Sequence, residues 1–302
     1  MKIRYVLNDK LRIKVTDKCN MHCSFCHFEG AKGAKDLAIN DETIQILKSL
    51  RKNFSAVHIT GGEPFLYSDL ITLIDVLESL EYKISITTNG YFQLSQALEI
   101  ADKLNSINFS LHSFNDAYLC TTVNNVKEYK SRVIRNILSL KDKVDVRINT
   151  VATSNPNQHI EDIVKFCFEN KITINILQEL NHNILSIYKD KLRENGFTQT
   201  EKVYMYPGSN VRHVFQDNKH NKVVFKEIEL FTPDFLCKDC RFIGECNEGF
   251  SFIRLENDPL KIRMCLNQKS ISYSEFMCNY YAQICKLLEA PYETELRKER
   301  PI

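Results

Sequence analysis

Short runs of apolar and β-branched residues alternate, over roughly the first 180 positions, with longer stretches in which apolar residues recur every three to four positions. The short runs predict strands and the longer periodic stretches predict helices. Six strands are expected on this basis, at residues 11–16, 56–60, 84–88, 107–111, 144–151 and 172–177.

Helices are expected between these strands, one after Asn40, one after Ser68, and three over residues 93–104, 125–140 and 157–170. Asn40 and Ser68 are the expected caps of the first two helices. The apolar faces of those two helices are predicted to consist of Ile44, Leu47, Leu50, Leu70, Ile74 and Leu77.

This alternation implies parallel strands joined by crossover helices. Six units are too few for a closed eight-unit barrel, so the pattern predicts an α/β fold built on an open, partial (β/α)6 TIM-like barrel. In such barrels the chemistry takes place at the carboxyl ends of the strands.

The alternation is expected to stop near residue 180. Strands follow at 203–206, 211–216 and 223–228, with a turn at 217–221, then a hairpin formed by 251–257 and 260–266 and a closing helix at 272–289. The predicted domains are therefore a core barrel over 1–200 and a smaller β-hairpin/α domain over 201–302.

Composition narrows the class of protein. The chain has 302 residues, a net charge of +2 and 43% hydrophobic residues, so no global basic field argues for nucleic acid. No apolar run approaches the length of about 18 residues that a membrane span needs, and the first residues lack the apolar core of a signal peptide. These features predict a cytoplasmic protein that does not bind nucleic acid or membrane.

Eleven cysteines in a cytoplasmic chain point to metal rather than to disulfides. One group near the start has the spacing C-x3-C-x2-C and consists of Cys19, Cys23 and Cys26. A second group near the end consists of Cys237, Cys240, Cys246 and Cys265. The remaining four are expected to be small buried apolar residues: Cys120, Cys167, Cys278 and Cys285.

Three kinds of site could use the first group. Residues 23–27 contain an attachment motif for c-type haem, but haem leaves Cys19 without a role, and the chain shows no export signal. A structural zinc ion needs a fourth ligand, which His22 or His27 would have to supply. A [4Fe–4S] cluster can be held by three thiolates with one iron left open, and this interpretation is favoured.

The first group, with Phe25 just before its third cysteine, resembles the signature of the radical S-adenosylmethionine (SAM) enzymes. The segments LRIKVTDKCN, ITGGEPFLYSDL, TTNG, FSLHS and VRINTV resemble, in the same order, those of the MoaA branch, which cyclises GTP. The resemblance implies reductive cleavage of SAM to a 5′-deoxyadenosyl radical, with electrons from a donor such as flavodoxin or ferredoxin.

The resemblance also implies roles for individual residues. The first three cysteines would hold the cluster, and Arg12, His58 and Arg147 would contact an anionic substrate, with His58 in place of the family's arginine. The residues implied to bind SAM are Phe25, Gly61, Gly62, Glu63, Thr88, Ser110 and Leu180.

The spacing C-x2-C-x5-C in the second group resembles the SPASM and twitch domains that hold an auxiliary [4Fe–4S] cluster in peptide-modifying enzymes. The arginine-rich run that follows the corresponding cysteines in MoaA is absent, since the chain reads RFIGECNEGF there. A zinc ribbon is the structural alternative for four cysteines. Binding by all four cysteines is favoured, because Cys246 completes a run that has no other evident purpose; the alternative is three ligands with an open iron.

We therefore expect a radical SAM enzyme with two [4Fe–4S] clusters that abstracts hydrogen from its substrate, a ribosomally made peptide being favoured. The alternative is rearrangement or cyclisation of a nucleotide or another anionic metabolite, including GTP. The non-enzymatic alternative is an iron–sulfur or zinc protein on a degenerate scaffold.

Overall fold

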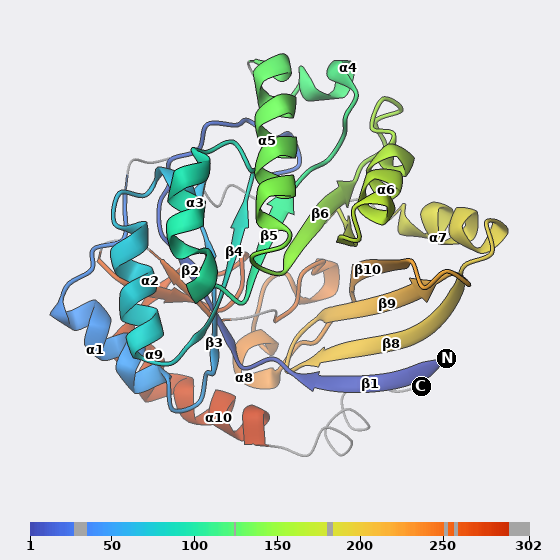
Figure 1. Ribbon diagram of the computed structural model, residues 1–302. Helices are drawn as coiled ribbons and strands as arrows, with labels where there is room; N and C mark the ends of the chain where they lie inside the picture. Colours follow the sequence, from blue (N-terminus) through green and yellow to red (C-terminus); the bar gives the residue numbers. More distant parts are fainter. Residues whose placement is uncertain (27–34, 124, 180–183, 251–252, 257–258, 290–302) are drawn as a thin grey trace.

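Six parallel strands, adjacent in space in the order in which they follow one another in the chain, form the centre of a single 13-stranded sheet in the computed structural model (Figure 1). The structure describes residues 1–26, 35–123, 125–179, 184–250, 253–256 and 259–289. The predicted partial barrel is confirmed. Its strands are β2 (Lys10–Lys14), β3 (Ala56–Thr60), β4 (Lys83–Thr88), β5 (Ser106–Ser110), β6 (Val146–Ala152) and β7 (Thr173–Gln178).

The C-terminal part of the chain extends both edges of this central sheet. β10 (Lys222–Ile228) pairs in parallel with β7, and β11 (Ile253–Glu256) pairs in parallel with β2. The full order is β1-β8-β9-β10-β7-β6-β5-β4-β3-β2-β11-β12-β13. The other strands are β1 (Lys2–Leu7), β8 (Thr198–Tyr206), β9 (Asn210–Gln216), β12 (Lys261–Arg263) and β13 (Ile271–Ser272). The suggested boundary between residues 200 and 201 falls inside β8.

The crossover helices lie along one face of the central strands (Figure 1). The first of them begins as expected, because the side chain of Asn40 accepts a hydrogen bond from the N–H of Thr43 at 2.9 Å. The helices are α1 (Asp41–Leu50), α2 (Leu70–Ser79), α3 (Leu94–Ile100), α4 (Asp116–Leu119), α5 (Val126–Leu140), α6 (Ile160–Glu169), α7 (Leu185–Glu194), α8 (Asp234–Cys237), α9 (Tyr273–Asn279) and α10 (Tyr281–Glu289), with three single turns η1 (Pro64–Leu66), η2 (Ala101–Lys103) and η3 (Ile243–Glu245).

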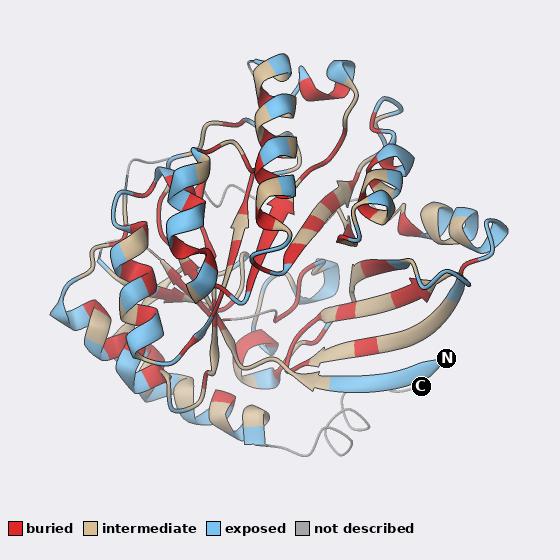
Figure 2. Cartoon of the chain, viewed as in Figure 1, coloured by how far each residue is buried: buried red, intermediate tan, exposed pale blue. Residues whose placement is uncertain are grey.

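The two faces of the central sheet differ in burial, and the strands alternate between red and tan in Figure 2. On β2, Leu11 and Ile13 face the helices and are at most 1% exposed, whereas Lys10, Arg12 and Lys14 are only half-buried. β3, β4 and β6 show the same alternation. The face opposite the helices, called the inner face below, is therefore polar and keeps partial access to solvent.

Several expected boundaries are wrong. The residue at the cap of α2 is Asp69 and not Ser68, and Asp69 makes no capping hydrogen bond. The helical pattern continues past residue 180 through α7, and the closing helix is divided in two at Tyr280. Cys120 and Cys278 are exposed, so only part of the cysteine expectation holds: Cys167 is fully buried.

The alternating residues of β1 were also not recognised as a strand. This strand lies at the edge of the sheet, pairs with β8, and is largely exposed on both faces, so it lacks the buried apolar side that marks a strand in sequence. Among the described residues, no helix is both long and apolar enough to span a membrane.

Candidate functional site

The first cysteine group lies on the loop that leaves the carboxyl end of β2, where the barrel architecture predicts the chemistry. This loop is held by the turn after β3: the N–H groups of Gly62 and Glu63 donate to the carbonyl oxygens of Thr16 and Lys18 at 2.8 and 2.7 Å. It is held further by the N–H of His22, which donates to the carbonyl oxygen of Thr122 at 3.2 Å.

Glycine is required in this turn because the cysteine loop lies directly against it. A Cβ atom at Gly62 would lie 2.0 Å from the carbonyl oxygen of Lys18 and 2.9 Å from the Cβ of Cys19. A Cβ at Gly61 would lie 2.8 Å from the carbonyl oxygen of Thr16. The two glycines therefore allow the backbone of the cysteine loop to approach closely, which is a structural use of the Gly-Gly pair in this chain.

The side chain of Glu63 is completely buried and binds donors from two neighbouring loops. Its carboxylate accepts hydrogen bonds from Thr88 Oγ1 and from the N–H of Asn89, both at 2.7 Å, and from the N–H of Phe65 at 3.1 Å. Burial raises the pKa of Glu63 to about 7, against the opposing effect of these hydrogen bonds. Glu63 thus links the turn after β3 to the end of β4.

The thiols of the first group affect one another's ionisation. Burial raises the pKa of Cys23 to about 12, with further contributions from the charges of Cys26 and Cys19, and burial likewise raises the pKa of Cys19. Within the described residues, no three His, Cys, Asp or Glu side chains are close enough together to hold a metal ion. The loop nevertheless gathers three thiols whose ionisation a cation would favour, and this donor set fits an iron–sulfur cluster.

Of the other residues implied to bind SAM, Phe25 is on this loop and Ser110 is at the end of β5. The ring of Phe25 packs edge-on against His112, with centroids 4.6 Å apart. Nδ1 of His112 accepts the N–H of Val151 at 3.1 Å, and burial lowers the pKa of His112 to about 4, so the ring is neutral with its hydrogen on Nε2. Ser110 is half-buried at the carboxyl end of β5. Leu180 lies outside the described residues.

Cationic side chains from five strands lie on the inner face. Register places Arg12 of β2 beside His58 of β3, and Lys226 of β10 beside Arg212 of β9. The set consists of Lys10, Arg12, His58, Arg147, Arg212 and Lys226.

The positive charges of this set act on one another. The pKa of Lys10 is lowered to about 8, first by burial and then by Arg212, Arg147 and Arg12. Burial and the charges of Arg12, Lys10 and Lys226 also lower the pKa of His58 well below its usual value. The positive charge of Arg147 is partly neutralised, because its guanidinium binds the carboxylate of Asp145, with Nε 2.8 Å from Oδ2.

The second cysteine group surrounds α8 and the end of β12. Burial raises the pKa of Cys237 to about 11, with contributions from Cys240 and Cys246, and burial raises the pKa of Cys265 to about 12, with contributions from Glu248 and Cys246. Backbone N–H groups point at two of the sulfurs: that of Gly249 lies 3.2 Å from Cys246 Sγ, and that of Asn267 lies 3.4 Å from Cys265 Sγ.

Glu248 connects this group to the inner face. Its Oε2 accepts the N–H of Leu266 at 2.8 Å and lies 3.6 Å from Cys265 Sγ. The charges of Arg254 and Arg12 act on Glu248, and register places Arg254 of β11 directly beside Arg12 of β2. Both cysteine groups are therefore attached to the same central strand.

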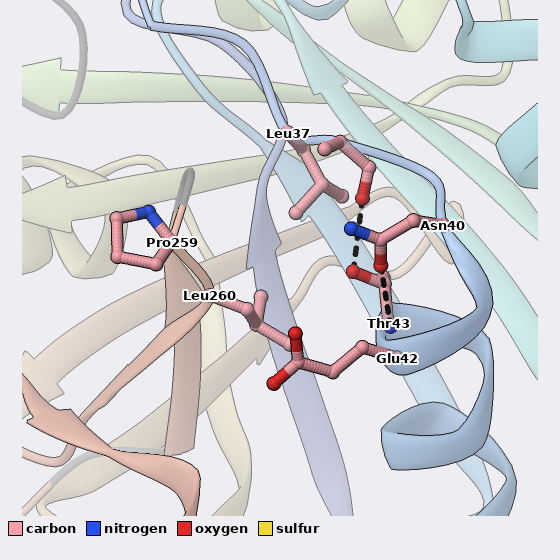
Figure 3. Close-up of a pocket in the computed structure, with 7 residues that line it drawn as sticks. Leu37, Asn40, Glu42, Thr43, Pro259 and Leu260 are labelled. Carbon is pink, nitrogen blue, oxygen red and sulfur yellow. Dashed lines mark hydrogen bonds between the residues drawn. The ribbon is translucent and has the colours of Figure 1, made fainter.

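A separate small pocket lies beside the N-terminus of α1, between Leu37, Asn40 and Glu42 on one side and Pro259 and Leu260 on the other (Figure 3). Two of its polar side chains bind locally: Thr43 Oγ1 donates to the carbonyl oxygen of Ala38, and Asn40 Oδ1 accepts the N–H of Thr43, both at 2.9 Å. None of the residues implied to bind SAM or substrate lines it.

Sequence reasoning missed several residues of the inner face and of the cysteine loop. Lys10 alternates with apolar neighbours, a period of two that could have marked an inward face, whereas Lys226 is followed by Glu227 and has no such signal. Asn89 was also missed, although its Nδ2 donates to Asn20 Oδ1 at 2.6 Å and so ties the cysteine loop to the end of β4.

The fold and the three-cysteine loop define a class of partial-barrel proteins that hold a cluster at the carboxyl end of the first central strand. Residues 13–167 match the family model of the radical SAM superfamily. The chain belongs to the radical SAM superfamily of enzymes, and this membership implies one [4Fe–4S] cluster and SAM.

Among curated proteins, the chain is 30% identical over 228 residues to a probable GTP 3′,8-cyclase of Methanocaldococcus jannaschii, covering 68% of this chain and 75% of the relative. It is 35% identical over 165 residues to a probable GTP 3′,8-cyclase of Saccharolobus solfataricus. That match covers 52% of this chain and 51% of the relative, so the chain spans about half the length of this relative.

Among solved structures, SuiB of Streptococcus suis bound to S-adenosylmethionine has a TM-score of 0.60 at 19% identity, over 88% of this chain and 63% of SuiB. SuiB bound to its precursor peptide SuiA gives the same TM-score over 96% of this chain and 67% of SuiB. At this identity the likeness establishes the fold alone, and it includes the C-terminal part of the chain.

Replacing Gly62 with alanine should displace the cysteine loop, because the new methyl group would overlap the carbonyl of Lys18. After anaerobic reconstitution, we expect Gly62→Ala to lose iron from the first cysteine group while keeping its helical circular dichroism. Gly244→Ala is the matched control, since a Cβ there meets no atom within 4 Å. Full iron loading in Gly62→Ala would contradict this account of the turn.

Proposed function

We propose that this radical SAM enzyme binds its cluster and SAM at the loop after β2 and acts on a small anionic molecule held on the inner face. Cys19, Cys23 and Cys26 would hold the cluster. The residues proposed to surround SAM are Phe25, Gly61, Gly62, Glu63, Thr88, Ser110 and Leu180. An electron donor such as flavodoxin or ferredoxin would reduce the enzyme.

The reaction requires the chain to hold the cluster, SAM and the substrate next to one another. When bound and reduced, the cluster and SAM supply a 5′-deoxyadenosyl radical, which removes a hydrogen atom from carbon in the substrate. The turn at Gly61–Glu63 orients the cysteine loop through its two backbone hydrogen bonds. The sheet contributes a polar inner face immediately below that loop, on which a substrate carbon could lie against the radical.

The observation that carries the choice of substrate is the concentration of positive charge on the inner face. The lowered pKa of Lys10 corresponds to a free energy of about 3 kcal/mol, only part of which comes from its cationic neighbours. A bound anion would offset this cost and would also shield Arg212 and Arg147 from each other. Arginine fork geometry suits phosphate and carboxylate groups.

Arg12, His58 and Arg147 were the expected substrate contacts, and the proposal keeps them and adds Lys10, Arg212 and Lys226. Relatives described as probable GTP 3′,8-cyclases make a nucleoside triphosphate a suitable probe. The concentration of positive charge on the inner face favours a nucleotide or another anionic metabolite over the peptide substrate that the sequence favoured.

A peptide substrate is the second candidate. It is supported by the C-x2-C-x5-C spacing of the second cysteine group and by the fold shared with SuiB, a protein crystallised with its precursor peptide. An acidic peptide would also satisfy the inner-face charges, so binding of neutral and anionic probes separates the candidates.

We also propose that the second group holds an auxiliary [4Fe–4S] cluster through all four cysteines. Hydrogen bonds from backbone N–H groups stabilise sulfur when it carries negative charge, and Cys246 and Cys265 each have one. This arrangement supports Cys246 as a ligand, in which case no iron of the cluster is open to the substrate. The cluster would then transfer electrons or stabilise the fold.

The first test is cleavage of SAM. Reconstituted protein with a strong reductant should release 5′-deoxyadenosine, and alanine at Cys19, Cys23 or Cys26 should abolish this release while iron remains at the second group. Cys120→Ala, which changes an exposed cysteine, should cleave SAM normally. Undiminished cleavage in the three variants would exclude the proposed cluster site.

The second test concerns substrate charge. Calorimetry should show that the wild type binds GTP and does not measurably bind guanosine. Arg212→Met should weaken GTP binding about 10–100-fold, since one charge-assisted contact contributes roughly 1.5–3 kcal/mol. Arg135→Met, an exposed change on α5, is the control. Equal affinity of the wild type for GTP and guanosine would count against an anionic substrate.

The third test concerns Cys246. In a variant that lacks the first three cysteines, Cys246→Ala should lose iron or change the electron paramagnetic resonance spectrum of the reduced cluster. An unchanged spectrum in this variant, combined with a wild-type spectrum that shifts when GTP is added, would favour three ligands and an open iron.

A further inference from the structure

We propose that anion binding on the inner face is coupled to uptake of a proton by Lys226. This inference rests on the proposed function, because it assumes an anionic substrate on this face. It adds a role for a residue that neither the sequence motifs nor the similarity to known proteins singles out.

Lys226 lies at the centre of the positive set. It is on β10, where register pairs it with Leu177 of β7 on one side and with Arg212 of β9 on the other. Its Nζ lies 3.3 Å from Asn149 Oδ1 on β6, which also accepts a hydrogen bond from Asn175 Nδ2 at 2.9 Å. The amine therefore points across the inner face toward the middle of the barrel.

The charged groups that face Lys226 are cationic. The pKa of Lys226 is lowered well below its usual value by burial and then by the charges of Arg212 on β9, Arg147 on β6, and Lys10 and Arg12 on β2. His58 on β3 also faces these groups, but burial and the neighbouring cations lower its pKa well below the usual value, so its ring is neutral near pH 7.

The nearby carboxylates are engaged with other partners. Glu227, the next residue on β10, binds Lys189 and His213 at 2.7 and 2.8 Å. Asp145 is paired with Arg147, and Glu201 on β8 is 3.3 Å from Arg4. Asp9 raises the pKa of Lys10 only as the last of five causes. These carboxylates therefore leave the surroundings of Lys226 positive.

Binding of an anion beside Lys226 should raise the pKa of its amine. The lowered pKa means that Lys226 loses its proton at a lower pH than an ordinary lysine does. An anion on the inner face favours the ammonium form and raises the pKa, so Nζ takes one proton from solvent and no other bond changes. The lysine then contributes one more positive charge to the complex than to the free protein.

Proton uptake by Lys226 determines how the affinity for the anion changes with pH. Because the complex binds more protons than the free protein, affinity for the anion must rise as pH falls through the window between the pKa of free Lys226 and its pKa in the complex. The slope is at most about tenfold per pH unit for each proton taken up. Lys10 responds in the same direction, from a pKa of about 8.

Replacing Lys226 with arginine tests the proton uptake separately from the positive charge. Lys226→Arg keeps a positive charge at every accessible pH, so the variant should bind the anion without taking up a proton at this position. A lysine that only fills space or holds Asn149 would leave proton uptake unchanged when replaced. Lys222→Arg on the same strand is the matched control, because Lys222 is exposed.

The experiment is calorimetric titration of the full-length protein with trimetaphosphate, an anion whose charge does not change near neutral pH. Titrations at about pH 8 in Tris and in HEPES, which differ in ionisation enthalpy, give the number of protons taken up per anion. We expect on the order of one proton for the wild type and for Lys222→Arg, less for Lys226→Arg, and almost none for the double variant Lys10→Arg/Lys226→Arg.

Two outcomes would overturn the coupling while leaving the proposed function in place: trimetaphosphate binding by the wild type without proton uptake, or equal uptake by Lys226→Arg and the wild type. Failure of the wild type to bind either trimetaphosphate or GTP would overturn the anionic substrate itself, and the coupling with it. The wild-type measurement decides the question even if a variant folds poorly.

Discussion

The close contact between the cysteine loop and the turn at residues 61–63 is the constraint on which the rest of the site depends. The two surfaces meet so tightly that Gly62 has no room for even one carbon beyond its backbone. Two backbone hydrogen bonds close this contact, and the buried carboxylate of Glu63 extends it to the end of β4. Loops after three successive strands are thus held as one unit, and this unit carries the loop of the three thiols.

The C-terminal part of the chain completes the site by adding strands to both edges of the central sheet. On one edge, β10 and β9 bring Lys226 and Arg212 to the inner face. On the other edge, β11 places Arg254 beside Arg12 and brings the second cysteine group next to β2. The site is therefore composite, and neither half of the chain contains all of the inner face.

The polarity of the inner face follows from this construction. A closed barrel fills its interior with branched apolar side chains, whereas this open sheet keeps solvent access on the inner face and can place charged groups there. The positive charges weaken one another's ionisation in the free protein. A bound anion would offset this repulsion between the positive charges of the inner face.

The amino-acid sequence was sufficient to predict the six-strand barrel, the two cysteine groups and the membership of a family. These features rest on local signals: alternating burial along each strand, the cap at Asn40 and the spacing of neighbouring cysteines. Prediction from the sequence was wrong where the local signal was weak, as for the exposed edge strand β1, and where a helix was interrupted, as at Tyr280.

Which distant residues act together depends on strand pairing. Lys10, Arg212 and Lys226 are ordinary strand residues in the sequence, and they join Arg147 in one cationic set because strand pairing places β2, β6, β9 and β10 around a common face. Likewise, the need for glycine at position 62 comes from the backbone of Lys18, which only the folded loop brings into contact. Pairing between residues far apart in the chain is set by the sum of many contacts, so no short stretch of sequence records it.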